Sequence, residues 1–180
     1  MAKILILCAN GLEECEALIA NDLFRRAKLE SYLISIHQDL MITSSNKVNF
    51  KCDLLLNQIN PEDYDALYLP GGLMGVNNLK NSSACLSLIK EFHAKKKLIA
   101  AICAAPSIIA DDLKLVKDNE FTCYPGCSLS ASNNQRFFKK DHLLTAKGLG
   151  VAFEFAKEII AYLENKELGE RILKQIQYEQ

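Results

Sequence analysis

Continuous apolar runs alternate along this chain with segments in which apolar residues recur every three or four positions. An unbroken run predicts a strand buried on both faces, as in a parallel sheet, whereas the longer spacing predicts an amphipathic helix. The predicted strands occupy residues 3–9, 31–36, 65–72 and 97–103. The predicted helices occupy residues 13–27, 83–96, 150–165 and 166–177, and a further helix begins at Ala105 or Pro106. Strands and helices alternate over most of the chain, which predicts a doubly wound α/β layer.

Two segments interrupt this alternation. Residues 41–56 predict an extended, hairpin-like insertion, and residues 136–148 predict two strands joined at the letters KKDH. We expect both to pair at the edges of the sheet.

Composition limits the classes of function. A chain of 180 residues that is 49% hydrophobic fits a single domain, spanning 1–180, with a sizeable core. Twenty-one basic and 22 acidic residues give a formal charge of -1, which provides no electrostatic case for nucleic acid or an anionic membrane as partner. Seven cysteines, an N-terminus without a leader pattern and the lack of an apolar run near ~20 residues predict a cytoplasmic protein with reduced thiols. Cys123 and Cys127 have no second cysteine or histidine pair at zinc spacing, so no metal site is predicted.

Cys103 stands where an apolar strand stops and a proline-marked helix begins. Ligands of open α/β sheets bind beyond the carboxyl ends of strands, and NGLEECE and PGGLMG follow two other such ends. Unpaired N–H groups and the positive end of a helix dipole would favour the thiolate. Lowering a thiol pKa from ~8.5 to ~5.5 needs about 4 kcal/mol, more than a helix end supplies, so a further donor to the sulfur is required. The alternative is an inert core cysteine, the usual state of a free cysteine in an apolar run.

The donor to the sulfur must come from another segment. A carboxylic acid kept protonated by burial and by a nearby negative charge would serve. Glu16 is the candidate because it lies one turn into the helix, whereas Glu13 and Glu14 lie at its exposed start. The alternative is a solvated Glu16 on the helix surface. We expect all three histidines to be solvated at the surface: His37, His93 and His142.

Four motifs together resemble those of the DJ-one/ThiJ/PfpI superfamily, in its order and spacing and over essentially the whole chain. They are GLEECE, LPGG, AAICAAP and GLGVAFEFAKEII. With Ala104 after the cysteine, the chain is similar to the branch that contains the Parkinsonism-associated deglycase and its small bacterial relatives. The protease-like branch has histidine at that position, so peptidase activity is not supported. The resemblance implies a flavodoxin-like, mostly parallel sheet with helices on both faces and a small hairpin insertion.

The resemblance also implies roles for single residues. Cys103 would be the nucleophile, and Glu16 a protonated acid hydrogen-bonded to its sulfur. The backbone N–H groups of Gly72 and Ala104 would hold an oxyanion. Tyr124 stands where the deglycase has a histidine before a proline, so that proton carrier is absent, and Tyr124 would line the pocket or donate its hydroxyl.

The implied activity needs no cofactor and acts on 2-oxoaldehydes such as methylglyoxal and glyoxal, or removes their adducts from thiols and amines. A different class of function is a redox-responsive oxidative-stress protein or chaperone, in which oxidation of Cys103 is the signal. A third alternative is a domain with this fold and no activity. The resemblance also implies a homodimer, although Asn46 stands where some relatives have an arginine directed at the partner subunit, so other contacts would hold the two chains together.

Overall fold

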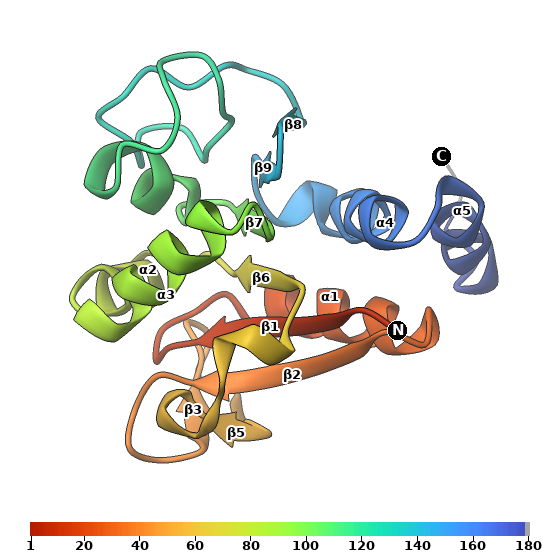
Figure 1. Cartoon of the computed structure of the whole chain (residues 1–180), viewed down its shortest axis with the longest axis horizontal. Coiled ribbons are helices and arrows are strands. Elements are labelled where there is room, and N and C mark those ends of the chain that lie inside the picture. The colour runs from red at the N-terminus through yellow and green to blue at the C-terminus, as the bar shows by residue number, and fades with distance from the viewer. Residues whose placement is uncertain (179–180) are drawn as a thin grey trace.

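The computed structural model of the chain, which describes residues 1–178, is built on a seven-stranded sheet (Figure 1). The strands lie in the order β5-β2-β1-β6-β7-β9-β8. All neighbours are parallel except the edge strand β8, which is antiparallel to β9. The predicted flavodoxin-like, mostly parallel sheet is confirmed. The seven strands are β1 (Lys3–Cys8), β2 (Glu30–Ser35), β5 (Leu54–Leu55), β6 (Ala66–Leu69), β7 (Leu98–Ile102), β8 (Phe137–Lys140) and β9 (Leu143–Ala146).

Helices cover both faces of the sheet, as predicted (Figure 1). One face carries α1 (Glu14–Arg26), α4 (Ala152–Leu163) and α5 (Lys166–Gln175). The other carries α2 (Leu73–Lys80), α3 (Ser83–Ala94) and a short helical segment that begins at Pro106 and ends in a π-turn, Ile108–Asp112. Each layer buries its own apolar core against the sheet. Among residues 1–178, no helix has both the length and the apolar character needed to cross a bilayer.

Helix α1 begins at the first carboxylates of its predicted segment. The Glu13 side chain accepts the N–H of Cys15 at 3.4 Å and so caps the helix. Arg25 and Arg26 lie in the last turn, where positive charge opposes the helix dipole. Glu13 thus fixes the start of the helix that carries Glu16.

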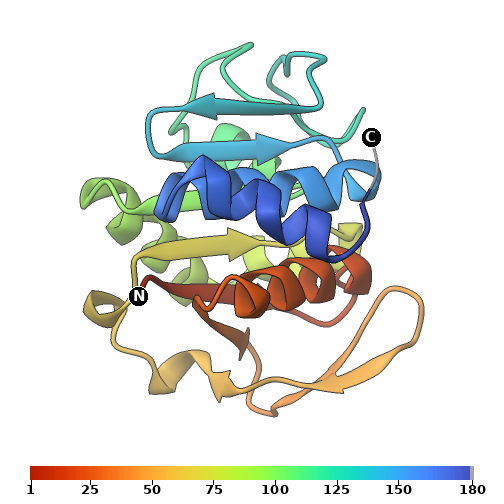
Figure 2. The same ribbon diagram turned by 90° about the vertical axis from the view of Figure 1, so that its right-hand side faces the viewer.

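The predicted insertion at residues 41–56 is a hairpin, but it does not extend the edge of the main sheet. Strands β3 (Met41–Thr43) and β4 (Asn49–Lys51) pair with each other in a separate two-stranded sheet, and only β5 joins the main sheet, beside β2 (Figure 2). Helix α2 lacks a sequence signal because glycine and asparagine, both poor helix formers, occupy its middle. Gly75 is needed there, since a β-carbon at that position would lie 2.7 Å from Leu12 Cα.

Candidate active site

The carboxyl ends of β1, β6 and β7 meet at one edge of the sheet, because the three strands are parallel neighbours. Three loops therefore converge there. The loop after β1 leads into α1, the loop after β6 contains Gly71 and Gly72, and Cys103 follows β7 directly. This edge is where open α/β sheets bind their ligands.

Cys103 has a left-handed backbone with φ +65°, which is uncommon for any residue other than glycine. Its neighbours hold it in this conformation. Its N–H donates to Ala146 O at 2.9 Å, and its carbonyl accepts the N–H of Tyr124 at 2.8 Å and the thiol of Cys123 at 3.2 Å. A strained residue of this kind costs on the order of 1–3 kcal/mol and turns the chain sharply. The turn leaves the side chain half-buried at the strand end instead of inside the sheet.

Glu16 is completely buried, with 0% of its surface exposed. Its Oε2 accepts the backbone N–H of Gly71 at 2.8 Å, and its carbonyl accepts the Tyr68 hydroxyl at 3.0 Å. Its Oε1 has no hydrogen-bond partner by distance and angle within residues 1–178. The thiol of Cys103 interacts with this carboxyl group. Glu16 therefore faces the sulfur and not the solvent.

Gly71 is the residue that lets these two side chains meet, and the sequence reasoning did not single it out. A β-carbon at Gly71 would lie 2.4 Å from Cys103 Cβ, 2.6 Å from Glu16 Oε2 and 3.0 Å from Cys103 Sγ. Any side chain there would occupy the space that the site uses. Only the doubled glycine of PGG could have indicated this requirement.

The backbone N–H groups of Gly72 and Ala104 both act on the Cys103 sulfur and oppose the rise of its pKa. Gly72 has φ +87°, and a β-carbon there would lie 2.5 Å from Glu13 N and 2.5 Å from Gly11 O. Glycine is therefore required at this position for both its conformation and its close contacts. Two amides directed at one atom form a small site for a negative charge.

Burial acts on both ionisable groups. It raises the pKa of Glu16 to about 7, against hydrogen bonds from Gly71 and Cys103 that lower it. Burial, and then the charge of an ionised Glu16, raise the pKa of Cys103 to about 12. The expected lowering of the Cys103 pKa is thus wrong beside an ionised Glu16, because desolvation of the sulfur outweighs the two amides. The two groups titrate together, since a proton placed on Glu16 removes the charge that holds a proton on the sulfur.

Tyr124 is 52% exposed, and its backbone N–H donates to the carbonyl of Cys103 at 2.8 Å. With Leu149 and Val151 it lines a hollow of about 560 Å³, and its ring is the nearest neighbour of Gly148. This volume is within the range of small-molecule sites. The structure thus places Tyr124 in the wall of this hollow.

Two expectations about other ionisable residues are wrong. Glu14 is buried at the start of α1, and Ser45 reaches back to donate to it at 3.4 Å. The histidines are all half-buried and bonded, because each meets a partner from another segment. His37 Nε2 accepts the N–H of Asn10 at 3.0 Å. His142 Nε2 lies 3.0 Å from His93 Nδ1.

Within residues 1–178 no group of three or more histidine, cysteine, aspartate or glutamate side chains is arranged to hold a metal ion. Cys123 is buried, and its thiol bonds to the carbonyl of Cys103. Its role within the described residues is therefore to support the turn at Cys103.

The sequence model of the DJ-1/PfpI family matches residues 2–162 of this chain. The chain belongs to this family. It is 32% identical over 176 residues to Protein dj-1beta of Drosophila melanogaster, with 94% of each chain covered. It is 30% identical over 176 residues to Protein DJ-1 homolog B of Arabidopsis thaliana; the match covers 96% of this chain and 40% of that longer protein. Its fold matches the solved structure of oxidized Toxoplasma gondii DJ-1 with a TM-score of 0.93 at 31% identity, over 100% of both chains.

Proposed function

We propose that this protein is a cofactor-independent glyoxalase and deglycase. Its substrates would be 2-oxoaldehydes such as methylglyoxal and glyoxal, or their adducts with thiols and amines. The observation that carries the proposal is the meeting of Cys103, the buried Glu16 and two amides around Gly71. A nucleophile, a proton acceptor and an oxyanion site are the parts that addition to a carbonyl requires.

The proposed reaction begins with the thiol proton. Glu16 accepts it while the Cys103 sulfur adds to the aldehyde carbon of methylglyoxal. Glu16 then returns the proton to the carbonyl oxygen, which gives a neutral hemithioacetal and leaves Glu16 ionised. The amides of Gly72 and Ala104 stabilise the oxygen as it becomes negative. A carboxyl pKa of about 7 suits this transfer, because a general base works best when its pKa is near the working pH.

The second stage moves one proton between adjacent carbons. Glu16 takes the proton from the former aldehyde carbon and returns it to the neighbouring carbon, while the hydroxyl proton of the hemithioacetal passes to the ketone oxygen. The ketone thus becomes an alcohol and the hemithioacetal becomes a thioester. Water then hydrolyses the thioester, which releases lactate and restores the Cys103 thiol. No electrons enter or leave overall, so the reaction needs no redox cofactor.

Lactate formation from methylglyoxal tests the proposal. Wild-type protein should produce lactate between pH 6 and 8, and Cys103→Ser should not. Cys15→Ser is the matched control, because Cys15 is an exposed thiol on α1 and its loss should leave lactate formation unchanged. Equal rates for wild type and Cys103→Ser at every pH would rule out the proposed enzyme.

The second candidate function is redox sensing by the same cysteine. The structural neighbour described as oxidized favours it, and so does a carboxyl group beside Cys103, which in its protonated form could donate to a sulfinate. Under mild peroxide, intact-mass and peptide measurements should then show oxygen added to Cys103 before the other six cysteines. Oxidation spread evenly over all seven would count against a tuned site.

We also propose that the protein is a cytoplasmic homodimer. Asn46, which stands where some relatives have an arginine directed at the partner subunit, donates to Ser45 of its own chain at 3.4 Å. A dimer would therefore rely on contacts other than an arginine at this position. Sedimentation velocity at micromolar concentration should give the mass of two chains, and a single-chain mass would refute the dimer.

A further inference from the structure

The outer edge of β8 is a second place where this chain is equipped to bind something. β8 is the last strand of the sheet, and no strand within residues 1–178 pairs with its outer side. Arg136 O accepts the N–H of Lys147, and the β8–β9 register continues from that pair. Because antiparallel residues alternate between inward and outward hydrogen bonding, the N–H and carbonyl groups of Phe137 and Lys139 point away from β9. The edge therefore offers two donors and two acceptors.

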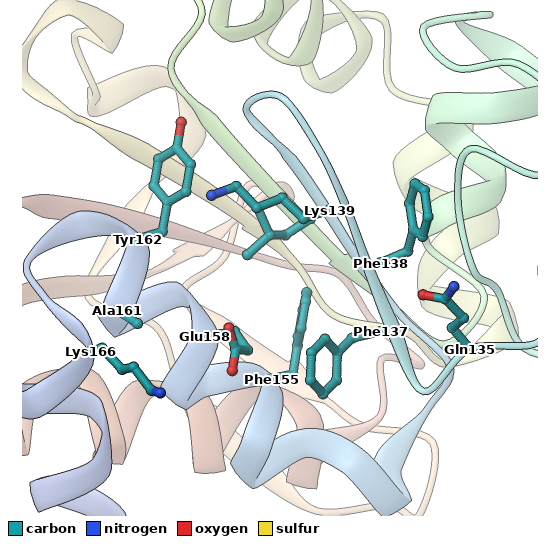
Figure 3. Close-up of a pocket in the computed structure, with 10 residues that line it drawn as sticks. Gln135, Phe137, Phe138, Lys139, Phe155, Glu158, Ala161, Tyr162 and Lys166 are labelled. Carbon is teal, nitrogen blue, oxygen red and sulfur yellow. The ribbon is translucent and has the colours of Figure 1, made fainter.

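A hollow of about 480 Å³ lies beside this edge, between β8, β9 and α4 (Figure 3). The rings of Phe137 and Phe155 lie next to each other in its wall (Figure 3). Leu144 is a further apolar residue of the lining. The hollow shares no lining residue with the candidate active site. It is large enough to receive an aliphatic or aromatic side chain from outside.

The rim of the hollow is cationic on the strand side. The Lys139 ammonium lies 4.6 Å from the centre of the Tyr162 ring and makes no ion pair within residues 1–178. Glu158 on α4 is the acidic residue of the lining, and its carboxylate is already paired with Lys157 at 2.7 Å. The segment 136–140 has three cations and no anion. A ligand approaching along β8 therefore meets a free positive charge at Lys139.

This charge pattern selects between the possible occupants. Pairing β8 with β8 of a second copy would bring two segments with three cations each side by side, which is unfavourable, and lysine on an edge strand is a common protection against such pairing. A partner strand with acidic side chains would instead be attracted to the cations of β8. We propose that the edge of β8 binds an extended acidic peptide segment of another protein, which adds as a further strand and inserts one large apolar side chain into the hollow.

The register predicts the sequence that such a segment needs. Phe137 and Lys139 are two residues apart, so their side chains lie on the same face of the strand. In an antiparallel partner, an acidic residue opposite Lys139 is followed two positions later by an apolar residue opposite Phe137. The preferred motif is thus acid, any residue, then a large apolar residue. A segment with a basic residue at the first position should bind more weakly.

Fluorescence anisotropy with labelled peptides tests this binding mode. The peptide TTETFTT should bind wild-type protein saturably below about 1 mM, and TTKTFTT should bind more weakly. Replacing the phenylalanine of the peptide with alanine should weaken binding about ten-fold or more. Lys139→Glu should weaken TTETFTT about five-fold and strengthen TTKTFTT by a similar factor. Lys90→Glu is the matched control, because it makes the same charge change on the exposed side of α3 and should leave both affinities unchanged.

Four results would overturn the proposal. Three come from the binding assay: no saturable binding, equal affinity of the two peptides for wild-type protein, or peptide preferences that Lys139→Glu does not exchange. The fourth comes from sedimentation, because a fall to the mass of a single chain on adding peptide would assign this edge to a second copy. Circular dichroism checks that the variants are folded. Lactate formation by Lys139→Glu should equal that of wild type, so failure here is distinguishable from failure of the proposed enzyme.

Discussion

Replacing Gly71 with alanine adds one carbon atom at the point where the candidate site has no space for it. The new β-carbon would lie 2.4 Å from Cys103 Cβ and 2.6 Å from Glu16 Oε2, whereas carbon atoms in contact normally lie ~3.5–4.0 Å apart. The backbone of Gly71 is not in the left-handed region, so alanine meets no conformational penalty there. The whole effect of the substitution is therefore steric.

The expected loss of stability follows from this overlap. Overpacking a buried site by one carbon typically costs about 1–3 kcal/mol. For a chain of this size, each kcal/mol lowers the melting temperature by roughly 2–4 °C, so a loss of about 2 kcal/mol lowers it by roughly 4–8 °C. Activity should fall more steeply, because a shift of about 1 Å between reacting groups costs on the order of 100-fold in rate.

Urea unfolding and the lactate assay measure the two effects on the same protein samples. Gly150→Ala is the stability control, because a β-carbon there has no atom within 4 Å. It should be neutral or slightly stabilising. If Gly71→Ala unfolds at the same urea concentration as Gly150→Ala and still forms lactate at the wild-type rate, the proposed contact between Cys103 and Glu16 is wrong.

Other predictions concern ionisation. Glu16→Gln removes the charge that raises the pKa of Cys103, so the curve of iodoacetamide rate against pH should move to lower pH; an unmoved curve would show that the groups do not interact. Burial raises the pKa of Glu16 from 4.5 to about 7, so its favourable contribution to stability is complete below pH 4.5 and is lost as pH rises through 7. The free energy of unfolding in urea should therefore rise for Glu16→Gln relative to wild type between pH 5 and pH 8. A constant difference between the two proteins would contradict this. Burial, and then the positive charge of His93, lower the pKa of His142 from 6.5, so its contribution is present above pH 6.5 and lost as pH falls below it. The stability lost by wild type between pH 7 and pH 5 should be smaller in His142→Gln, and equal losses would refute the assignment.

Much of the fold could be predicted from local patterns. The apolar runs became the buried strands β1, β6 and β7, because a central strand in a parallel sheet has no polar face. The β-rich segment 31–36, which contains two serines, became β2. The segments with apolar residues at helical spacing became α1, α3, α4 and α5, because each helix packs one apolar face against the core. Prediction failed where packing overrode propensity. Helix α2 forms despite its glycine and asparagines because it packs closely on Leu12.

The sequence alone was enough to choose most residues of the candidate site. It was not enough to predict their ionisation or their packing. Strand ends and helix position were enough to propose Cys103 and Glu16, since the carboxyl ends of neighbouring parallel strands must meet. Gly72 and Ala104 were proposed from the family resemblance alone. The need for glycine at position 71 came only from the tertiary structure. The same holds for the direction of the Cys103 pKa and for the pairing of His93 with His142. These properties depend on desolvation, on steric overlap and on charges that act through space, and each of them is set by residues far apart in the chain.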